Sequence, residues 1–437
     1  MTEPAQPDDS YLRSVAAATE KAVATAEPIR SEFSGASEAL LADTERWVTE
    51  HAEDLLALSH DLHAHPEEAF AEHRSVGQVA ELLRRHGREA EVGVGGLDTA
   101  LRASAGSGGP HVAVLAEYDA LPGIGHGCGH NIICSAGVGA FLAAVGAVER
   151  TGGRVSLLGT PAEEGGGGKE HLARAGLFDD VDAVVMLHPF SHDIATHPFL
   201  GRRQVEIVFH GIAAHASAQP FMGRNALDAA VACYQGIAAL RQHMPSTDRV
   251  HGVITDGGKR PNVVPDRAAL LFYARSPEPG SLQDLASRIE SIAEGAAMTT
   301  GCGVELRWDH NPAYLPIRHN EALAARWVRH QRARGRTSLP RGVVPEYLTG
   351  STDLGNISYR LPSIHPMIGL GDPNLSLHTE EFAAAAASEA GDAAVLDGAS
   401  GLAMTAVDYL ADETLRHAVQ KEFQSEGGPL DVPNYFT

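Results

Sequence analysis

The chain has 437 residues, of which 43% are hydrophobic and 21% are charged. This composition is ordinary for a globular protein and excludes a disordered chain or a fibre. The length is about three times that of a typical domain, so we expect more than one folding unit. The formal net charge of −22 argues against a nucleic-acid partner, because binding a phosphate backbone requires clustered cations.

The N-terminal sequence MTEPAQPDDS is acidic where a secretory signal is basic. No stretch approaches the roughly 20 uninterrupted apolar residues of a membrane-spanning helix. The four cysteines are too few and too scattered to form a disulfide framework. We therefore predict a cytoplasmic protein with reduced thiols and no membrane partner.

Residues 1–40 show only a weak amphipathic pattern, which predicts a mobile leader followed by one helix. Helical periodicity is stronger over residues 40–62 and 75–86. Three short apolar runs, at 112–115, 155–158 and 183–187, indicate buried strands, and an apolar helix at 137–148 separates the first two. This α/β alternation predicts a mostly parallel central sheet, whose ligands bind beyond the carboxyl ends of the strands.

A different pattern begins at Arg202. Strands at 204–209, 250–255, 268–275 and 304–308 alternate with helices at 226–240 and 282–297. The order β-α-β-β-α-β is that of a ferredoxin-like α+β domain. We predict that this domain, 202–312, is inserted into a first domain made of 41–201 and 313–437. The second part of the first domain contains helices at 321–334 and 397–410 and a strand-like HPMIGLG segment.

The first chemically suggestive cluster is AEYDALPGIGHGCGHN, which follows the strand at 112–115. Residues two apart in an extended chain share a side, so Cys128 and His130 can face one cation. Gly127 and Gly129 permit the tight backbone that such a loop needs. Taken alone, a glycine-rich turn with a buried free cysteine explains this segment more simply, because short Cys/His spacings are common by chance.

The second cluster is GTPAEEGGGG, which follows the strand at 155–158. Glu163 and Glu164 are consecutive, and a buried carboxylate must be paired or bind a metal. One glutamate can bind the metal while the other acts as a base toward water. A phosphate-binding glycine loop is the alternative, but two adjacent acids would repel phosphate.

Two further histidines lie in similar positions. His188 ends the segment VVMLHP, and His378 lies in LSLHTEEF after a Gly/Pro-rich loop. Either histidine alone would more often be structural. Four separate clusters rich in metal-binding side chains together predict a metal site.

These motifs also occur in a fixed order: YDALPG, HGCGHN, TPAEEGGGG, HP, GIAAHA, RPNVVPD, GSTDLGNIS and HTEEF. Over roughly residues 50–415 the chain resembles the dinuclear metal-dependent aminoacylases and carboxypeptidases. Within that family it is similar to the branch of auxin-conjugate hydrolases, p-aminobenzoyl-glutamate hydrolase and β-alanyl dipeptidases. The resemblance implies a metallopeptidase domain with an inserted lid and dimerisation domain.

The resemblance also implies a role for each matching residue. Glu163 would be the general base, and Asp119 would orient a ligand histidine. Two divalent ions, zinc or manganese, would be bound by five ligands: Cys128, His130, Glu164, His188 and His378. The chain departs from the wider family in having Glu117 in place of a ligand histidine and Cys128 in place of a bridging aspartate. Asn131 replaces an aspartate common in the auxin-conjugate enzymes, which favours aminobenzoyl-glutamate or β-alanyl substrates.

The inserted domain matches the family at three substrate-binding positions. By resemblance, Asn262 binds the oxygen of the scissile carbonyl, and Arg275 binds a terminal carboxylate. The residue types suit these roles, since an oxyanion needs donors and a guanidinium binds carboxylate in a bidentate manner. His215 would reach the active site of the partner subunit, which implies a homodimer.

Together these observations predict a metal-dependent hydrolase. The expected substrate is a small dipeptide or an N-acyl amino acid, such as an aminobenzoyl or β-alanyl compound, with a free carboxylate. The alternatives are an N-acyl-amino-acid deacylase and an inactive metal-binding assembly subunit. Retention of Glu163 disfavours the inactive alternative, because binding alone needs no base.

Overall fold

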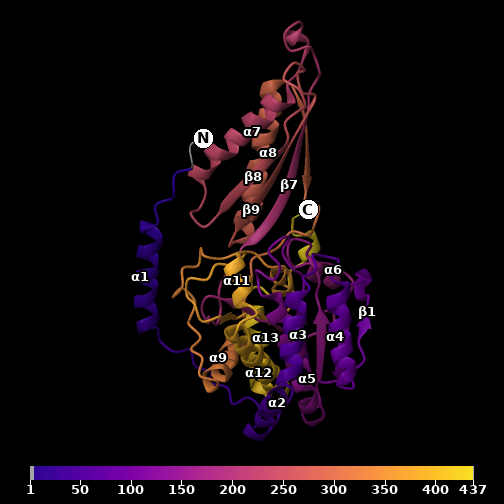
Figure 1. Ribbon diagram of the computed structural model, residues 1–437, viewed down its shortest axis with the longest axis vertical. Helices are drawn as coiled ribbons and strands as arrows, with labels where there is room; N and C mark the ends of the chain where they lie inside the picture. The colour runs from indigo at the N-terminus through magenta and orange to yellow at the C-terminus, as the bar shows by residue number, and fades with distance from the viewer. Residues whose placement is uncertain (1–3, 437) are drawn as a thin grey trace. The chain divides into compact units, whose positions relative to one another are not determined.

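The computed structural model describes residues 4–436, which form two compact units (Figure 1). The first comprises residues 4–198, 318–349 and 357–431, and the second 199–317, 350–356 and 432–436. The second unit therefore includes residues 199–201, 313–317, 350–356 and 432–436, which lie outside the predicted bounds of 202–312. Side-chain hydrogen bonds explain this difference. Asn356 donates to the carbonyl of Ala313 (2.8 Å), and Gln283 donates to the carbonyl of Tyr435 (2.6 Å).

The first unit contains a six-stranded mixed sheet. Its order is β1 (Glu91–Val92), β2 (Leu101–Gly106), β4 (Arg154–Gly159), β3 (His111–Ala116), β5 (Ala183–Val185) and β11 (Ser363–Ile364). The last four of these are mutually parallel, and three of them, β3, β4 and β5, match the predicted apolar runs. β1 and β2 are antiparallel to their neighbours, so the expected mostly parallel sheet is a mixed one. β2 was missed because its buried residues alternate with exposed ones, which leaves no apolar run.

A separate two-stranded parallel sheet pairs β6 (His188–Phe190) with β12 (Met367–Gly369), the segment predicted from HPMIGLG. Helices α2 (Glu38–Glu50), α3 (Ala52–Ala64), α5 (His130–Thr151) and α12 (Glu389–Ala411) pack together in the core of the unit (Figure 1). The other helices of this unit are α1 (Ser10–Thr25), α4 (His73–Arg85), α6 (Gly168–Arg174), α9 (Glu321–Ala333), α11 (Glu380–Ala385) and α13 (Glu413–Ser425). The short helix α10 (Leu354–Ser358) lies where the chain passes from the second unit to the first.

Helix α5 lies directly on β3. A Cβ atom at Gly137 would stand 2.5 Å from the carbonyl oxygen of Leu115, so this close approach requires glycine. By length and composition α5 could span a membrane, but 89% of its most apolar stretch is buried inside the protein. It is therefore the core helix of its unit, and it begins at a predicted metal ligand.

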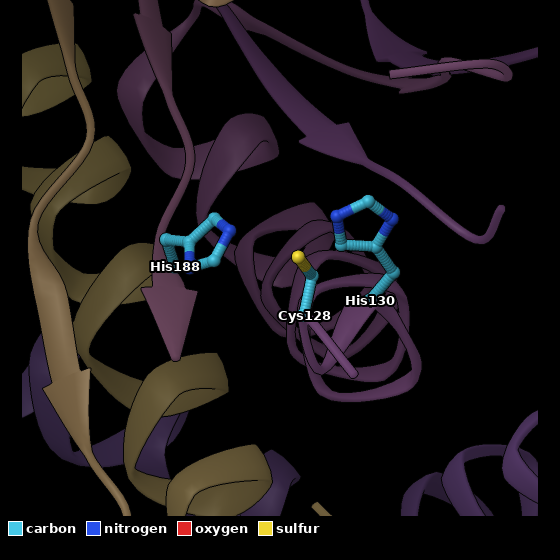
Figure 2. A group of neighbouring side chains, drawn as sticks. All are labelled: Cys128, His130 and His188. Atoms are coloured by element: carbon cyan, nitrogen blue, oxygen red, sulfur yellow. The ribbon is translucent and has the colours of Figure 1, made fainter. Parts of the chain in front are cut away.

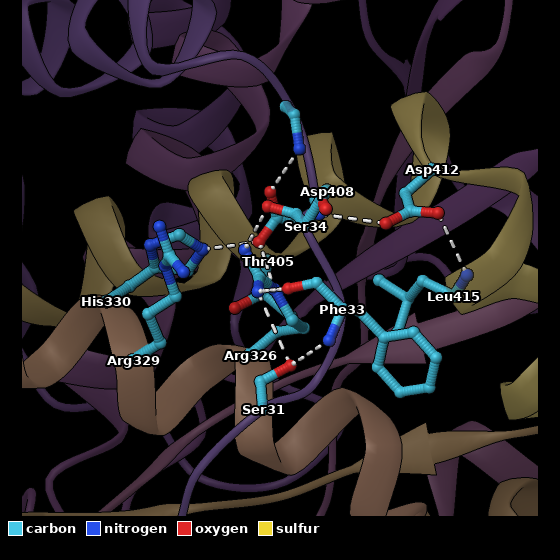
Figure 3. Close-up of polar contacts among 12 residues, drawn as sticks. Ser31, Phe33, Ser34, Arg326, Arg329, His330, Thr405, Asp408, Asp412 and Leu415 are labelled. Atoms are coloured by element: carbon cyan, nitrogen blue, oxygen red, sulfur yellow. Dashed lines mark hydrogen bonds and ion pairs between the residues drawn. The ribbon is translucent and has the colours of Figure 1, made fainter.

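The segment between α1 and α2 is held firmly in the first unit (Figure 3). The guanidinium of Arg326 is completely buried and donates to the carbonyl of Phe33 (2.6 Å) and to Asp408 (2.7 Å). Asp408 also accepts hydrogen bonds from the backbone N–H of Ala36 (2.7 Å) and from His330 (2.6 Å). Residues 33–36, which lie in the predicted mobile leader, thus make hydrogen bonds to buried side chains of the first unit. Their contacts are made by backbone groups, which leave no pattern in the sequence.

The second unit has a four-stranded antiparallel sheet of order β10 (Gly303–Trp308), β7 (Gly201–His210), β9 (Arg267–Ser276) and β8 (Arg249–Asp256). Helices α7 (Ala226–Leu240) and α8 (Pro279–Thr300) cover one face, where Ile207, Phe272 and Ile289 form part of the core. The connection order and strand order are those of a ferredoxin-like fold. All six elements coincide with predicted ones.

The buried cluster around Asp408 generates a stability prediction. Asp408→Ala leaves the buried guanidinium of Arg326 without its carboxylate, and such a loss costs about 3–5 kcal/mol in free energy of unfolding. Asp43, which pairs with Arg150 (2.8 Å) and Arg46 (3.0 Å) at the surface, is the control, because exposed pairs of this kind contribute at most about 1 kcal/mol each. Urea unfolding of both variants measures the difference. Equal effects would contradict the role given to the cluster.

Candidate functional site

The predicted site residues follow three adjacent strands. Asp119 follows β3, Glu163 and Glu164 follow β4, and His188 follows β5. Because these strands are parallel neighbours, their carboxyl ends meet at one edge of the sheet. The side chains are thereby brought together from distant parts of the sequence.

Cys128 is central to the arrangement (Figure 2). Its sulfur lies between the rings of His130, the first residue of α5, and His188, the first residue of β6. The ligand atoms of these three side chains all lie within 4.8 Å of one another. Cys128, Glu164 and His378 form a second group by the same measure, and Glu163 falls in a further group with His130 and Glu164. All five predicted ligands thus fall into two groups that share the cysteine.

Hydrogen bonds orient both buried histidines toward the centre of the site. Nδ1 of His188 donates to the carbonyl of Pro189 (2.6 Å), and Nδ1 of His130 donates to the carbonyl oxygen (2.8 Å) and the carboxylate (3.1 Å) of Asp119. The Nε2 atom of each ring is therefore the one available to a metal. The other oxygen of Asp119 accepts from the backbone N–H of Glu164 (2.9 Å), so one carboxylate orients parts of both groups.

The electrostatics of the site favour a cation. Burial lowers the pKa of His188 to about 3, which keeps this ring neutral and able to bind a metal. Burial would also lower the pKa of His130, but the carboxylates of Asp119, Glu117 and Glu164 raise it well above the usual value. Burial and the nearby Glu164 raise the pKa of the Cys128 thiol far above its usual value. Only a strong cation at the site would stabilise the thiolate.

The donor set fits two divalent ions. Among the described residues, Nε2 of His130 and Oε1 of Glu164 are buried atoms without a hydrogen-bond partner, and metal binding would satisfy both. A set of thiolate, imidazole and carboxylate ligands suits zinc and other first-row metals.

A strained turn positions the two glutamates. Ala162 has a φ of +59°, which is unusual for a residue with a side chain. Glu72, completely buried, accepts hydrogen bonds from the N–H of Ala162 (2.9 Å) and the hydroxyl of Thr99 (2.7 Å) and thereby holds this turn. Beyond it, a carboxylate oxygen of Glu163 lies 3.9 Å from Nε2 of His130. Glu72 lies 90 residues before Ala162 in a polar stretch, so no local pattern in the sequence predicts its role.

His378 is also held in an unusual conformation, with a φ of +63°. Its N–H donates to the carbonyl of Gly127 (3.0 Å), and its Nε2 lies 3.7 Å from Oε1 of Glu164. Strain of this kind persists where the surrounding structure enforces it, typically at functional sites. The ring is 55% exposed, so this side of the centre is open to solvent.

The departures from the wider family have structural explanations. The amide of Asn131 donates to the hydroxyl of Ser59 (2.9 Å) and the carbonyl of Ala386 (3.0 Å). An ionised aspartate there would lose the donor to that carbonyl. Glu117 forms a buried ion pair with Lys169.

In the second unit, His215 and Asn262 lie on adjoining segments. His215 pairs with Val263 in a β-bridge, and the N–H of Ala216 donates to the carbonyl of Asn262 (3.0 Å). Both side chains are exposed. The structure thus brings together two of the three residues predicted to bind substrate.

Arg275, the third residue, lies on β9 directly opposite Arg202 of β7. Arg275 donates to the hydroxyl of Ser351 (3.2 Å), and the nearly buried guanidinium of Arg202 lies over the rings of Tyr273 (5.2 Å) and Tyr314 (4.1 Å). Like charges directly opposite across strands repel, so an anion near both would be stabilising. Arg202 was not among the predicted site residues, because its pairing with Arg275 depends on strand register.

Comparison with known proteins identifies the family. Residues 113–400 match peptidase family M20/M25/M40. The chain belongs to this family. Membership makes it a hydrolase of peptide or related amide bonds, in a family that includes dinuclear metal-binding peptidases.

Two M20 relatives and one solved structure are similar over most of the chain. The Xaa-Arg dipeptidase of Mus musculus is 39% identical, over 86% of this chain and 90% of that protein. One chain of the p-aminobenzoyl-glutamate hydrolase of Escherichia coli K12 is 32% identical, over 82% of this chain and 90% of the relative. A dinuclear metal-binding M20 peptidase from Bacillus subtilis shares the fold, with a TM-score of 0.60 at 20% identity over 82% of this chain and 99% of that one.

The shared cysteine gives a prediction about metal content. We expect His188→Ala and His378→Ala each to lose one metal ion, and Cys128→Ala to weaken both sites, because both groups contain its sulfur. Cys134→Ala is the matched control, since that buried cysteine lies in α5 outside both groups. Metal per chain after dialysis is the measurement. Loss of both ions from each histidine variant would show that the two groups are not separate sites.

Proposed function

We propose that the protein is a dipeptidase or amidohydrolase that acts on small substrates with a free carboxylate, using two zinc or manganese ions. Two observations support this proposal: Cys128 belongs to both groups that contain the predicted ligands, and a carboxylate oxygen of Glu163 lies 3.9 Å from Nε2 of His130. The named relatives act on Xaa-Arg dipeptides and on p-aminobenzoyl-glutamate, and both of these compounds contain an amide bond next to a free carboxylate.

In this proposal Cys128, His130 and His188 hold one ion, and Cys128, Glu164 and His378 hold the other. When bound, the ions supply Lewis-acid polarisation of the carbonyl and acidify water. Glu163 removes a proton from the attacking water and delivers it to the leaving amine.

The remaining groups bind the substrate or orient the ligands. Asn262 and His215 donate hydrogen bonds to the oxyanion. Arg275 binds the carboxylate of the substrate, and its neighbour Arg202 adds to the positive charge there. Asp119 keeps His130 in the tautomer that binds metal.

A panel of dipeptides and their C-terminal amides tests this assignment. Charge-assisted hydrogen bonds are worth about 1.5–3 kcal/mol, so Arg275→Ala should lower kcat/KM for free acids at least about tenfold and hardly affect the amides. Arg249→Ala is the matched control, because Arg249 lies opposite Arg275 on β8 but donates to the carbonyls of Ser246 and Asp248. Equal losses for acids and amides would remove Arg275 from the substrate site. Absence of turnover of the whole panel by the metal-loaded enzyme would contradict the proposed activity.

The same proposal includes a homodimer in which each site uses His215 of the other chain. Around the exposed His215, large apolar side chains are also exposed: Ile212, Phe221, Met222 and Val263. Such a group on a surface is typical of a protein interface.

Subunit exchange tests the borrowed histidine. His215→Ala and Glu163→Gln chains should each be nearly inactive, whereas a mixture forms heterodimers with one intact site. Random exchange makes half of the dimers mixed, so about a quarter of wild-type activity should return. If His215 acts within its own chain, a mixture that demonstrably exchanges subunits stays inactive.

A further inference from the structure

A second feature of the metal centre is the ion pair between Glu117, directly after β3, and Lys169 in the first turn of α6. Both side chains are completely buried. The chain has only three other lysines, Lys21, Lys259 and Lys421, and all three are exposed. Removing two charges from water is unfavourable, and apolar residues of similar volume are often at least as stable. Stability alone therefore does not account for this pair.

The pair directly adjoins the first ligand group. Lys169 binds Oε1 of Glu117, while Oε2 of Glu117 lies 3.6 Å from Nε2 of His130. His130 is only 1% exposed, and its Nε2 has no hydrogen-bond partner among the described residues. This nitrogen faces the centre because Nδ1 of the same ring donates to Asp119. Two atoms at this separation can both bind one ion, since zinc–nitrogen and zinc–oxygen bonds are about 2.0–2.2 Å long.

We infer that Glu117 is a sixth metal ligand, which binds the same ion as Cys128, His130 and His188, and that Lys169 is its positioning residue. This inference rests on the proposed dinuclear site. Lys169 occupies one carboxylate oxygen, so Glu117 contributes only the other. Glu117 thereby supplies a carboxylate ligand at the position where the wider family has a ligand histidine, and His130 binds the same ion.

The charges of the centre agree with this assignment. Glu117 adds a buried negative charge next to His130, where Asp119 and Glu163 already place carboxylates. Lys169 is the cation paired with this added carboxylate. Without Lys169, the additional carboxylate would leave the buried centre with excess negative charge.

Cobalt binding tests the inference without relying on activity. The variants are Glu117→Gln and the double variant Glu117→Gln/Lys169→Met, which removes both charges and leaves no unpaired lysine. Glu170→Gln is the matched control: Glu170 is the next residue of α6, is completely buried and is paired with Arg360 (2.7 Å), but belongs to neither ligand group. Titration with Co²⁺ gives the stoichiometry and both affinities, and visible absorption reports the coordination of each ion.

We expect wild type and Glu170→Gln to bind two ions alike. Glu117→Gln and the double variant should bind one ion as wild type does. They should bind the other ion at least about tenfold more weakly and with an altered absorption spectrum. Even residues that only hydrogen-bond to metal ligands typically change metal affinity about 10–100-fold when they are mutated. A double variant that binds both ions as wild type does would show that Glu117 is only the partner of Lys169. Equal weakening of both ions would also overturn the assignment to one of them. A wild-type protein that binds no cobalt would overturn the dinuclear site itself, which separates failure of the proposed function from failure of this inference.

Discussion

The site depends on negative charge that is buried at one edge of a sheet. Glu117 and Asp119 are completely buried after β3, and Glu163 and Cys128 are nearly so. Water does not solvate these groups, so cations must stabilise them. Lys169 supplies part of the positive charge, and the N-terminal end of α5 adds a favourable field. Divalent ions would supply the rest, which couples metal binding to the local stability of this edge.

The rest of the first unit provides a rigid support for this edge. Gly137 lets α5 approach β3 closely, and His130 lies at the start of that helix. Two residues next to the centre, Ala162 and His378, have positive φ angles that are unfavourable for residues with a side chain. Buried hydrogen bonds outside the two ligand groups, such as those of Glu72, maintain the strained turn. The closely packed helix α5 and the buried hydrogen bonds thus hold the strained loops, which carry candidate ligands, in one geometry.

The sequence predicted the parts of this design that leave a local pattern. Buried strands such as β3 appear as apolar runs, and the alternation in the second unit gave its strand and helix order. Residue type and the resemblance were enough to name the candidate ligands. They could not divide these ligands between two metal ions, because the place of Cys128 in both groups depends on the fold. The pair Glu117–Lys169 joins residues 52 apart and leaves no periodic signal. Contacts made by backbone groups, as at Phe33, are equally invisible in a sequence.

The two units carry opposite local charge, and this bears on the choice of substrate. The metal centre concentrates acidic groups, whereas the sheet face of the second unit places Arg202 opposite Arg275. Each arrangement is unfavourable alone: buried acids need cations, and paired guanidinium groups need an anion. In the proposed function, a carboxylate on the substrate would relieve the repulsion between the arginines. An acyl compound without the carboxylate would leave that repulsion in place. The positive charge that we propose to select free acids therefore depends on the strand register that sets Arg202 against Arg275, and not on the metal.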